Sequence, residues 1–198
     1  MRKQFFLSVF ALLLFGSATK AQHQYFPPGA LDSSPSSDQF LSKWYSKQLA
    51  ALDEPSLWSL SKTQKHETYR FLWLRTFHRP VAIRIDVNTD GTSQLTTKMT
   101  SGAGGYDPGH LVQNSKSLLT KEQTSFLLEK IKEHQFWKLA SAREPGGADG
   151  AEWILEGVKN GMYHVVDRWS PQGGPVRGIG LIMLNELAKL KIPGKELY

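Results

Sequence analysis

The chain of 198 residues contains no cysteine. Disulfide bonds, a thiol nucleophile and metal sites with cysteine ligands are therefore excluded. A lipid anchor of the kind that bacteria attach to a cysteine behind the signal peptide is excluded for the same reason. Small secreted domains of eukaryotes usually carry disulfides, so a cysteine-free exported chain fits the bacterial periplasm or exterior better.

Long apolar runs are also lacking. The segment from Phe5 to Phe15, broken only by Ser8, has about 11 residues, whereas a membrane-spanning helix needs about 20. Arg2 precedes this segment and small residues follow it up to Ala21, which is the layout of a secretory signal peptide. We therefore expect residues 1–21 to be cleaved after Ala21, which leaves a secreted or periplasmic protein with no transmembrane segment.

A strong excess of one charge is absent from the mature chain. The formal net charge of +6 comes from 24 basic and 18 acidic residues. Without Arg2, Lys3 and Lys20, 21 basic residues face 18 acidic ones, which leaves +3. This balance is not the footprint of a nucleic-acid-binding protein, so we expect no nucleic-acid partner. A protein or a small anionic ligand of the cell envelope stays open as the partner.

The sequence also lacks recognisable catalytic motifs. The chain has no phosphate-binding loop ending in Gly-Lys-Ser/Thr, no dinucleotide fingerprint, no Gly-x-Ser-x-Gly and no histidine pair at metal-ligand spacing. We therefore expect no cofactor and no metal. The sequence favours a non-enzymatic binding or accessory module. A small hydrolase or metal-dependent enzyme and a structural component of the cell envelope are the alternatives.

Proline and serine mark the start of the mature chain. Residues 22–37 include Pro27-Pro28-Gly29 and Ser33–Ser37, which predicts a flexible linker before a single domain over 38–198. Asp38 can cap a first helix. The apolar face expected for that helix, with three-to-four spacing, consists of Phe40, Leu41, Trp44, Tyr45 and Leu49.

Two turn signals organise the rest of the domain. Asp90-Gly91 and Asn160-Gly161 are typical of tight hairpin turns, and a loop and a helix follow each hairpin. The sequence predicts an α+β fold: an antiparallel sheet of about five strands, built from two hairpin–loop–helix units, with helices packed mainly on one face. The expected strands are 69–77, 81–87, 95–99, 152–158 and 162–169, and further helices are expected at 57–60, from 120 and at 176–190.

Carboxylates gather on one side of the second hairpin. With Asn160-Gly161 as the turn, Glu152, Glu156 and Asp167 lie within rung or diagonal distance of each other. Three such groups could act as acid and base or bind a hard cation. The alternative is an exposed sheet face on which the acids pair with a lysine or arginine of a neighbouring element. The candidate catalytic residues are Glu152, Glu156, Asp167 and His164.

Arginines and a glycine-rich loop are the candidate binding elements. Arg70, Arg75, Arg79 and Arg84 could together hold a carboxylate or phosphate group, or their stems could cover the sheet while their heads stay in water. The loop 101–109 could bind an anion through its backbone N–H groups, or form a flexible or folded-over connection. Arg168 over Trp153 would form a cation–π pair, and Trp153 could instead anchor a partner. The candidate binding residues are Arg75, Arg84, Tyr106, Asp107, His110, Trp153 and Arg168.

The segment from Asp149 to Pro171 resembles a segment of uncharacterised exported bacterial proteins. The resemblance implies an exported bacterial protein. It carries no known activity, so it assigns no functional residue.

Overall fold

The computed structural model describes residues 24–63, 66–141 and 146–198. The expected signal peptide, residues 1–21, lies outside this part of the chain. No helix in the described part is long and apolar enough to cross a membrane.

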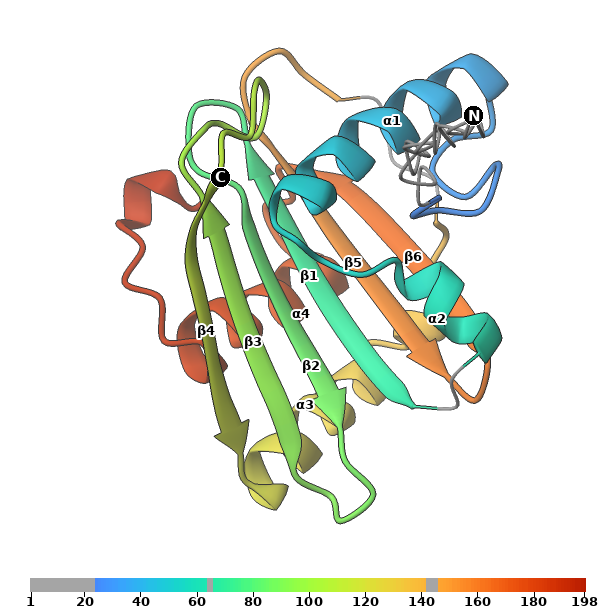
Figure 1. The fold of residues 1–198 in the computed structure, drawn as a ribbon, viewed down its shortest axis with the longest axis vertical. Coiled ribbons are helices and arrows are strands. Elements are labelled where there is room, and N and C mark those ends of the chain that lie inside the picture. The colour runs from blue at the N-terminus through green and yellow to red at the C-terminus, as the bar shows by residue number, and fades with distance from the viewer. Residues whose placement is uncertain (1–23, 64–65, 142–145) are drawn as a thin grey trace, which may run out of the picture.

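Six antiparallel strands form one sheet, in the spatial order β4-β3-β2-β1-β5-β6 (Figure 1). The first four strands follow one another as a meander, and β5 then returns to pair with β1. This arrangement confirms the antiparallel α+β fold and adds one strand to the predicted five. The strands are β1 (Glu67–Arg75), β2 (Val81–Val87), β3 (Ser93–Thr100), β4 (Leu111–Leu119), β5 (Ala151–Lys159) and β6 (Met162–Trp169).

The strand that the sequence does not predict is β4. It contains Gln113, Asn114, Ser115, Lys116 and Ser117, which are poor strand formers and show no alternation with apolar residues. Because β4 is an edge strand and most of it is exposed, it needs no apolar face. Its hydrogen bonds to β3 define it instead.

The second hairpin has the predicted register. Lys159 pairs with Met162 across the turn, and the pairing runs outward to Glu152 opposite Trp169. Asn160 and Gly161 both have positive φ angles, 53° and 80°. A two-residue turn of this type requires positive φ at both central positions, which explains why Asn-Gly fixes the register.

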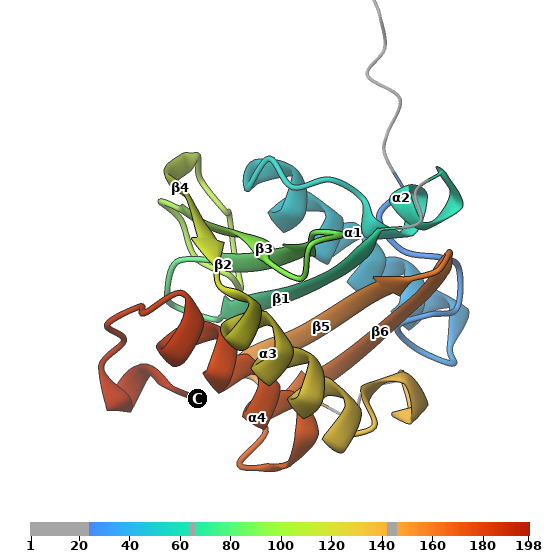
Figure 2. The same cartoon turned by 90° about the horizontal axis from the view of Figure 1, so that it is seen from below.

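Helices cover both faces of the sheet (Figure 2). The prediction that they lie mainly on one face is therefore wrong. The central strands explain this, because β1 and β5 are buried along almost their whole length and carry apolar side chains on both faces of the sheet. The helices α1 (Pro35–Ala51) and α2 (Leu57–Thr63) lie on one face, and α3 (Lys121–Glu133) and α4 (Gly174–Leu181), continued by a π-helix over Ile182–Leu187, lie on the other.

Each face has its own apolar core. On the α3–α4 face, Phe71, Trp73 and Trp153 pack with residues of the closing helix such as Ile179. On the α1 face, Leu72, Leu74 and Ile154 pack with α1. The N-terminal segment belongs to this second core, since Tyr25, Phe26 and Leu31 are buried in it.

The packed domain therefore starts before the predicted boundary at residue 38. Helix α1 begins at Pro35, and Asp38, expected as its cap, lies inside it. The carboxylate of Asp38 accepts hydrogen bonds from the backbone N–H groups of Gly29, Leu31 and Asp32. The segment assigned to a flexible linker is thus held against the domain from Tyr25 onward.

Candidate functional site

The predicted carboxylate cluster lies on the α1 face of the sheet. The register places Glu152, Glu156 and Asp167 on the same side of the hairpin, and each is 0% exposed. The Tyr45 hydroxyl of α1 donates a hydrogen bond of 2.7 Å to Asp167 Oδ2. The expectation of an exposed sheet face is therefore wrong, because α1 and the N-terminal segment cover it.

The pairing of Glu156 with an arginine is confirmed. Arg70 of β1 donates from Nε and Nη2 to Glu156 Oε2, at 2.8 and 2.6 Å. The Tyr163 hydroxyl donates to the other oxygen at 2.8 Å. Burial raises the pKa of Glu156, although the positive charge of Arg70 acts to lower it. Burial acts to lower the pKa of Arg70, but the negative charges of Glu156 and Glu54 raise it overall. We assign an ionised pair, because one oxygen accepts two guanidinium N–H groups at short distance.

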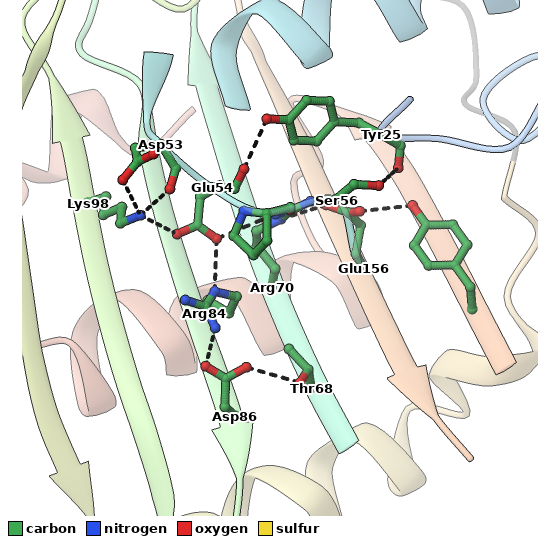
Figure 3. Close-up of polar contacts among 12 residues, drawn as sticks. Tyr25, Asp53, Glu54, Ser56, Thr68, Arg70, Arg84, Asp86, Lys98 and Glu156 are labelled. Atoms are coloured by element: carbon green, nitrogen blue, oxygen red, sulfur yellow. Dashed lines mark hydrogen bonds and ion pairs between the residues drawn. The ribbon is translucent and has the colours of Figure 1, made fainter. Parts of the chain in front are cut away.

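The pair belongs to a larger set of buried and half-buried charges (Figure 3). Glu54 comes from the α1–α2 connector, residues 52–56, and its carboxylate lies 3.1 Å from Lys98 Nζ, 3.0 Å from Arg84 Nε and 3.4 Å from Arg70 Nη1. Arg84 also pairs with Asp86, which accepts from the Thr68 hydroxyl. We call this set the sheet charge network; its members are Glu54, Arg70, Arg84, Asp86, Lys98 and Glu156.

The sequence points to members of this network but not to the network itself. It singles out Arg70, Arg84 and Glu156, but it predicts that the arginines bind a ligand or keep their heads in water. The side chain of Arg70 is 0% exposed and that of Arg84 only 15%. The carboxylates that they hold belong to the protein itself.

Arg75 and Trp153 lie in the core of the α3–α4 face. Arg75 is 3% exposed, lies 4.1 Å from the centre of the Trp73 ring and pairs with Glu196 at 2.7 Å. Burial lowers the pKa of Arg75 against the opposing effect of Glu196. Trp153 is 0% exposed, so it cannot anchor a partner as the sequence suggested.

The cation over Trp153 also differs from the expected one. Arg168 lies opposite Trp153 in the strand register, but it donates to the backbone carbonyls of Asp167 and Ala140. Arg177 of α4 lies 5.2 Å from the centre of the Trp153 ring. The strand register alone could not show this, because α4 lies outside the hairpin and packs on the ring from the face of the sheet.

The glycine-rich loop folds back on itself and onto β1. Within it, Gly102 N donates to Pro108 O and Ala103 N to Asp107 O, and Gly104 N donates to the carbonyl of His78. These N–H groups are therefore not available to an anion, and the phosphate-binding alternative is wrong. Asp107 pairs with Lys47, and the hydrogen bond from the Gly109 N–H, together with this lysine, lowers the pKa of Asp107.

The remaining two candidates in and after this loop have different surroundings. His110 lies within 3.1 Å of the Ser101 hydroxyl and is exposed. Tyr106 is 62% exposed and lies 6.2 Å from Phe77, ring centre to ring centre. Tyr106 is therefore a sequence-predicted candidate that the structure leaves open to a partner.

The His164 ring packs against Phe136 and Trp137, which follow α3 in the chain. Its ring centre lies 5.0 Å from that of Phe136 and 6.1 Å from that of Trp137. Its Nε2 is buried and has no hydrogen-bond partner within the described part of the chain. Burial lowers the pKa of His164, against backbone hydrogen bonds with Leu139 and Phe136 that raise it. This surrounding suits a neutral imidazole.

We expect stability to decrease as the pH falls below the usual histidine pKa of 6.5. Because the pKa of His164 is lower in the folded chain, the unfolded chain binds the proton first. The contribution of His164 is therefore complete above pH ~6.5 and is lost as the pH falls toward its folded pKa. His164→Gln should flatten the pH dependence of the unfolding free energy, measured with urea. His66→Gln, at an exposed histidine, is the control, and an equal slope in both variants would contradict the assignment.

Within the described residues, no group of three histidine, aspartate or glutamate side chains is arranged to hold a metal ion.

An aromatic surface that the sequence did not predict lies along α1. Phe40 is 66% exposed and lies 6.1 Å from Trp44, ring centre to ring centre. Trp44 Nε1 donates to the carbonyl of Gly104, which brings this pair next to Tyr106 and Phe77. We call this the aromatic–lysine surface; its members are Phe40, Lys43, Trp44, Lys47, Phe77 and Tyr106.

The sequence does not reveal this surface, because the three-to-four spacing predicts that Phe40 and Trp44 lie on the buried face of the helix. The buried residues of α1 are Asp38, Leu41, Tyr45, Gln48 and Leu49, so the true apolar face is turned away from Phe40. An open hollow runs over the outer side of α1, and its lining includes Phe40, Lys43, Trp44, Tyr106 and the connector residues 53–56.

No protein-family model matches the chain, and neither does any curated protein.

Proposed function

We propose that this chain is an exported, non-enzymatic binding protein that contacts its partner through the aromatic–lysine surface. One observation carries the proposal: Phe40, Phe77 and Tyr106, which are 66%, 58% and 62% exposed, gather beside one helix. Large apolar side chains that are exposed together mark interaction sites in proteins. The expected signal peptide supports export.

Rigidity supports a binding role for this surface. The Gln48 side chain donates to the carbonyls of Gly104 and Tyr106, and Trp44 donates to the first of these. The loop that presents Tyr106 is thus fixed to α1 before any partner arrives. A surface that is already ordered loses less conformational entropy on binding.

The composition of the surface favours a protein partner with acidic groups. Tyrosine, tryptophan and phenylalanine are enriched in protein interfaces, where they form the central contacts. Lys43 and Lys47 stand beside these rings and are exposed, so they would meet carboxylates at the rim of the contact. The alternative of a small hydrolase has less support, because both oxygens of Glu156 accept hydrogen bonds inside the domain.

The proposal is tested by photo-crosslinking in intact Gram-negative cells that express the chain with its first 21 residues. A photoreactive residue replaces Phe40, Tyr106 or, as the matched control, Met162, which is 58% exposed at the distant β5–β6 turn. Positions 40 and 106 should give the same protein adduct, and Met162 should not. Lys43→Glu with Lys47→Glu should reduce that adduct several-fold. An equal adduct from Met162, or indifference to the charge reversal, would contradict the proposal.

A further inference from the structure

The α1–α2 connector is bound to the sheet in the way that an acidic peptide would be. The carboxylate of Glu54 contacts three cations from three neighbouring strands: Arg70, Arg84 and Lys98. The connector backbone is held too, since Lys98 donates to the carbonyl of Asp53 and Arg70 to that of Pro55.

The charges of the sheet charge network do not balance without this carboxylate. When Glu54 is set aside, Arg70, Arg84 and Lys98 face only two carboxylates of the network. These are Glu156, which pairs with Arg70, and Asp86, which pairs with Arg84. Asp53, which lies 3.9 Å from Lys98, belongs to the connector and would leave with it. Within the sheet charge network one positive charge then remains, and such a charge favours a counter-ion.

The hydroxyl of Thr96 lies beside these cations and is free to form a hydrogen bond. Thr96 lies directly opposite Arg84 in the β2–β3 register and is 1% exposed. Its Oγ1 has no hydrogen-bond partner within the described part of the chain. Buried polar groups of native proteins normally have a partner, so Thr96 Oγ1 is available to an anionic ligand on this face.

The connector is suited to opening as a unit. It is five residues long and joins α1 to α2, and Asp53 within it has a positive φ of 53°. Residues other than glycine adopt this conformation at a cost, although aspartate tolerates it better than most. The connector also lines the open hollow outside α1, so solvent in this hollow reaches the connector.

We propose that Arg70, Arg84 and Lys98 form a carboxylate-binding site on the sheet, and that Glu54 closes this site until the carboxylate of an acidic ligand replaces it. The ligand carries the carboxylate either as a small organic acid or as an acidic side chain of a peptide. The site shares no residue with the aromatic–lysine surface, although both border the same hollow, and neither proposal depends on the other.

The experiment uses Glu54→Ala, which removes the carboxylate and leaves the cations. Thermal unfolding is followed while sodium acetate replaces sodium chloride at constant ionic strength. Acetate should raise the Tm of this variant by several degrees, because a ligand that binds only the folded chain stabilises it. The blocked peptide Leu-Asp-Glu-Pro-Ser, the sequence of the connector, is the second probe. A larger response to acetate identifies a small acid as the ligand, and a larger response to the peptide identifies an acidic side chain.

Asp53→Asn is the matched control, because Asp53 lies on the same connector and is 85% exposed, and asparagine also tolerates its positive φ. It should respond to acetate no more than the unaltered chain does. Glu54→Gln keeps the size of the side chain and provides a second variant where Glu54→Ala does not fold. In the unaltered chain, the probe that acts on the variants should increase hydrogen exchange of the connector amides severalfold. No Tm response in either Glu54 variant, or no change in connector exchange, would overturn the proposal.

Discussion

Arg70→Met should lower the free energy of unfolding by about 3–5 kcal/mol. The Arg70 side chain is 0% exposed and holds two carboxylates, Glu156 at 2.6 Å and Glu54 at 3.4 Å. Removal of the guanidinium leaves both acids buried and short of one cation. It also removes the donor to the Pro55 carbonyl, so the connector loses a contact. Urea denaturation measures the change.

The double variant Arg70→Met with Glu156→Met should recover a large part of this loss. Replacing both members of a buried ion pair with apolar side chains of similar volume is often close to neutral, whereas removing one member is not. Arg79→Met is the surface control, since Arg79 is exposed, and it should change stability by less than about 0.5 kcal/mol. A loss for Arg70→Met as small as that of the control would contradict the ionised assignment of the network.

Gly104→Ala should destabilise the fold by about 1–3 kcal/mol and shift the glycine-rich loop. A Cβ at Gly104 would lie 2.7 Å from the backbone atoms of Leu74 and Arg75. These atoms belong to β1, the central strand beside β5, and cannot move aside cheaply. The loop must move instead, so Trp44 and Gln48 lose the carbonyl to which both donate.

The shift of the loop is measured by NMR at the Trp44 indole N–H, whose signal should move as its acceptor is lost. Gly173→Ala is the matched control, because a Cβ at Gly173 meets nothing within 4 Å and its φ of −169° suits any residue. If Gly104→Ala changed the stability and the Trp44 signal no more than Gly173→Ala does, the loop would not be fixed to α1 as described. The rigid presentation of Tyr106 would then lose its support.

The sequence by itself determined the local features, because each of them depends on residues close together in the chain. Asn160-Gly161 fixes the register of the second hairpin, since only positive φ angles close that turn and the pleat then assigns every side chain to a face. Thr120 and Gln123 form a capping box at the start of α3, the helix that the sequence predicts from residue 120. The antiparallel α+β class followed from the two hairpins.

The tertiary structure decided everything that depends on which elements meet. Arg70 and Glu156 are separated by 86 positions and come together only because β5 returns to pair with β1. Nothing near Glu54 in the sequence shows that it will contact Arg84 and Lys98 on the sheet. The two-residue period of a strand determines the face of the sheet on which a side chain lies. Whether that side chain is buried, and what it pairs with, depends on the elements that cover the face. The covering of both faces therefore turned expected surface charges into a buried network and left Phe40 exposed.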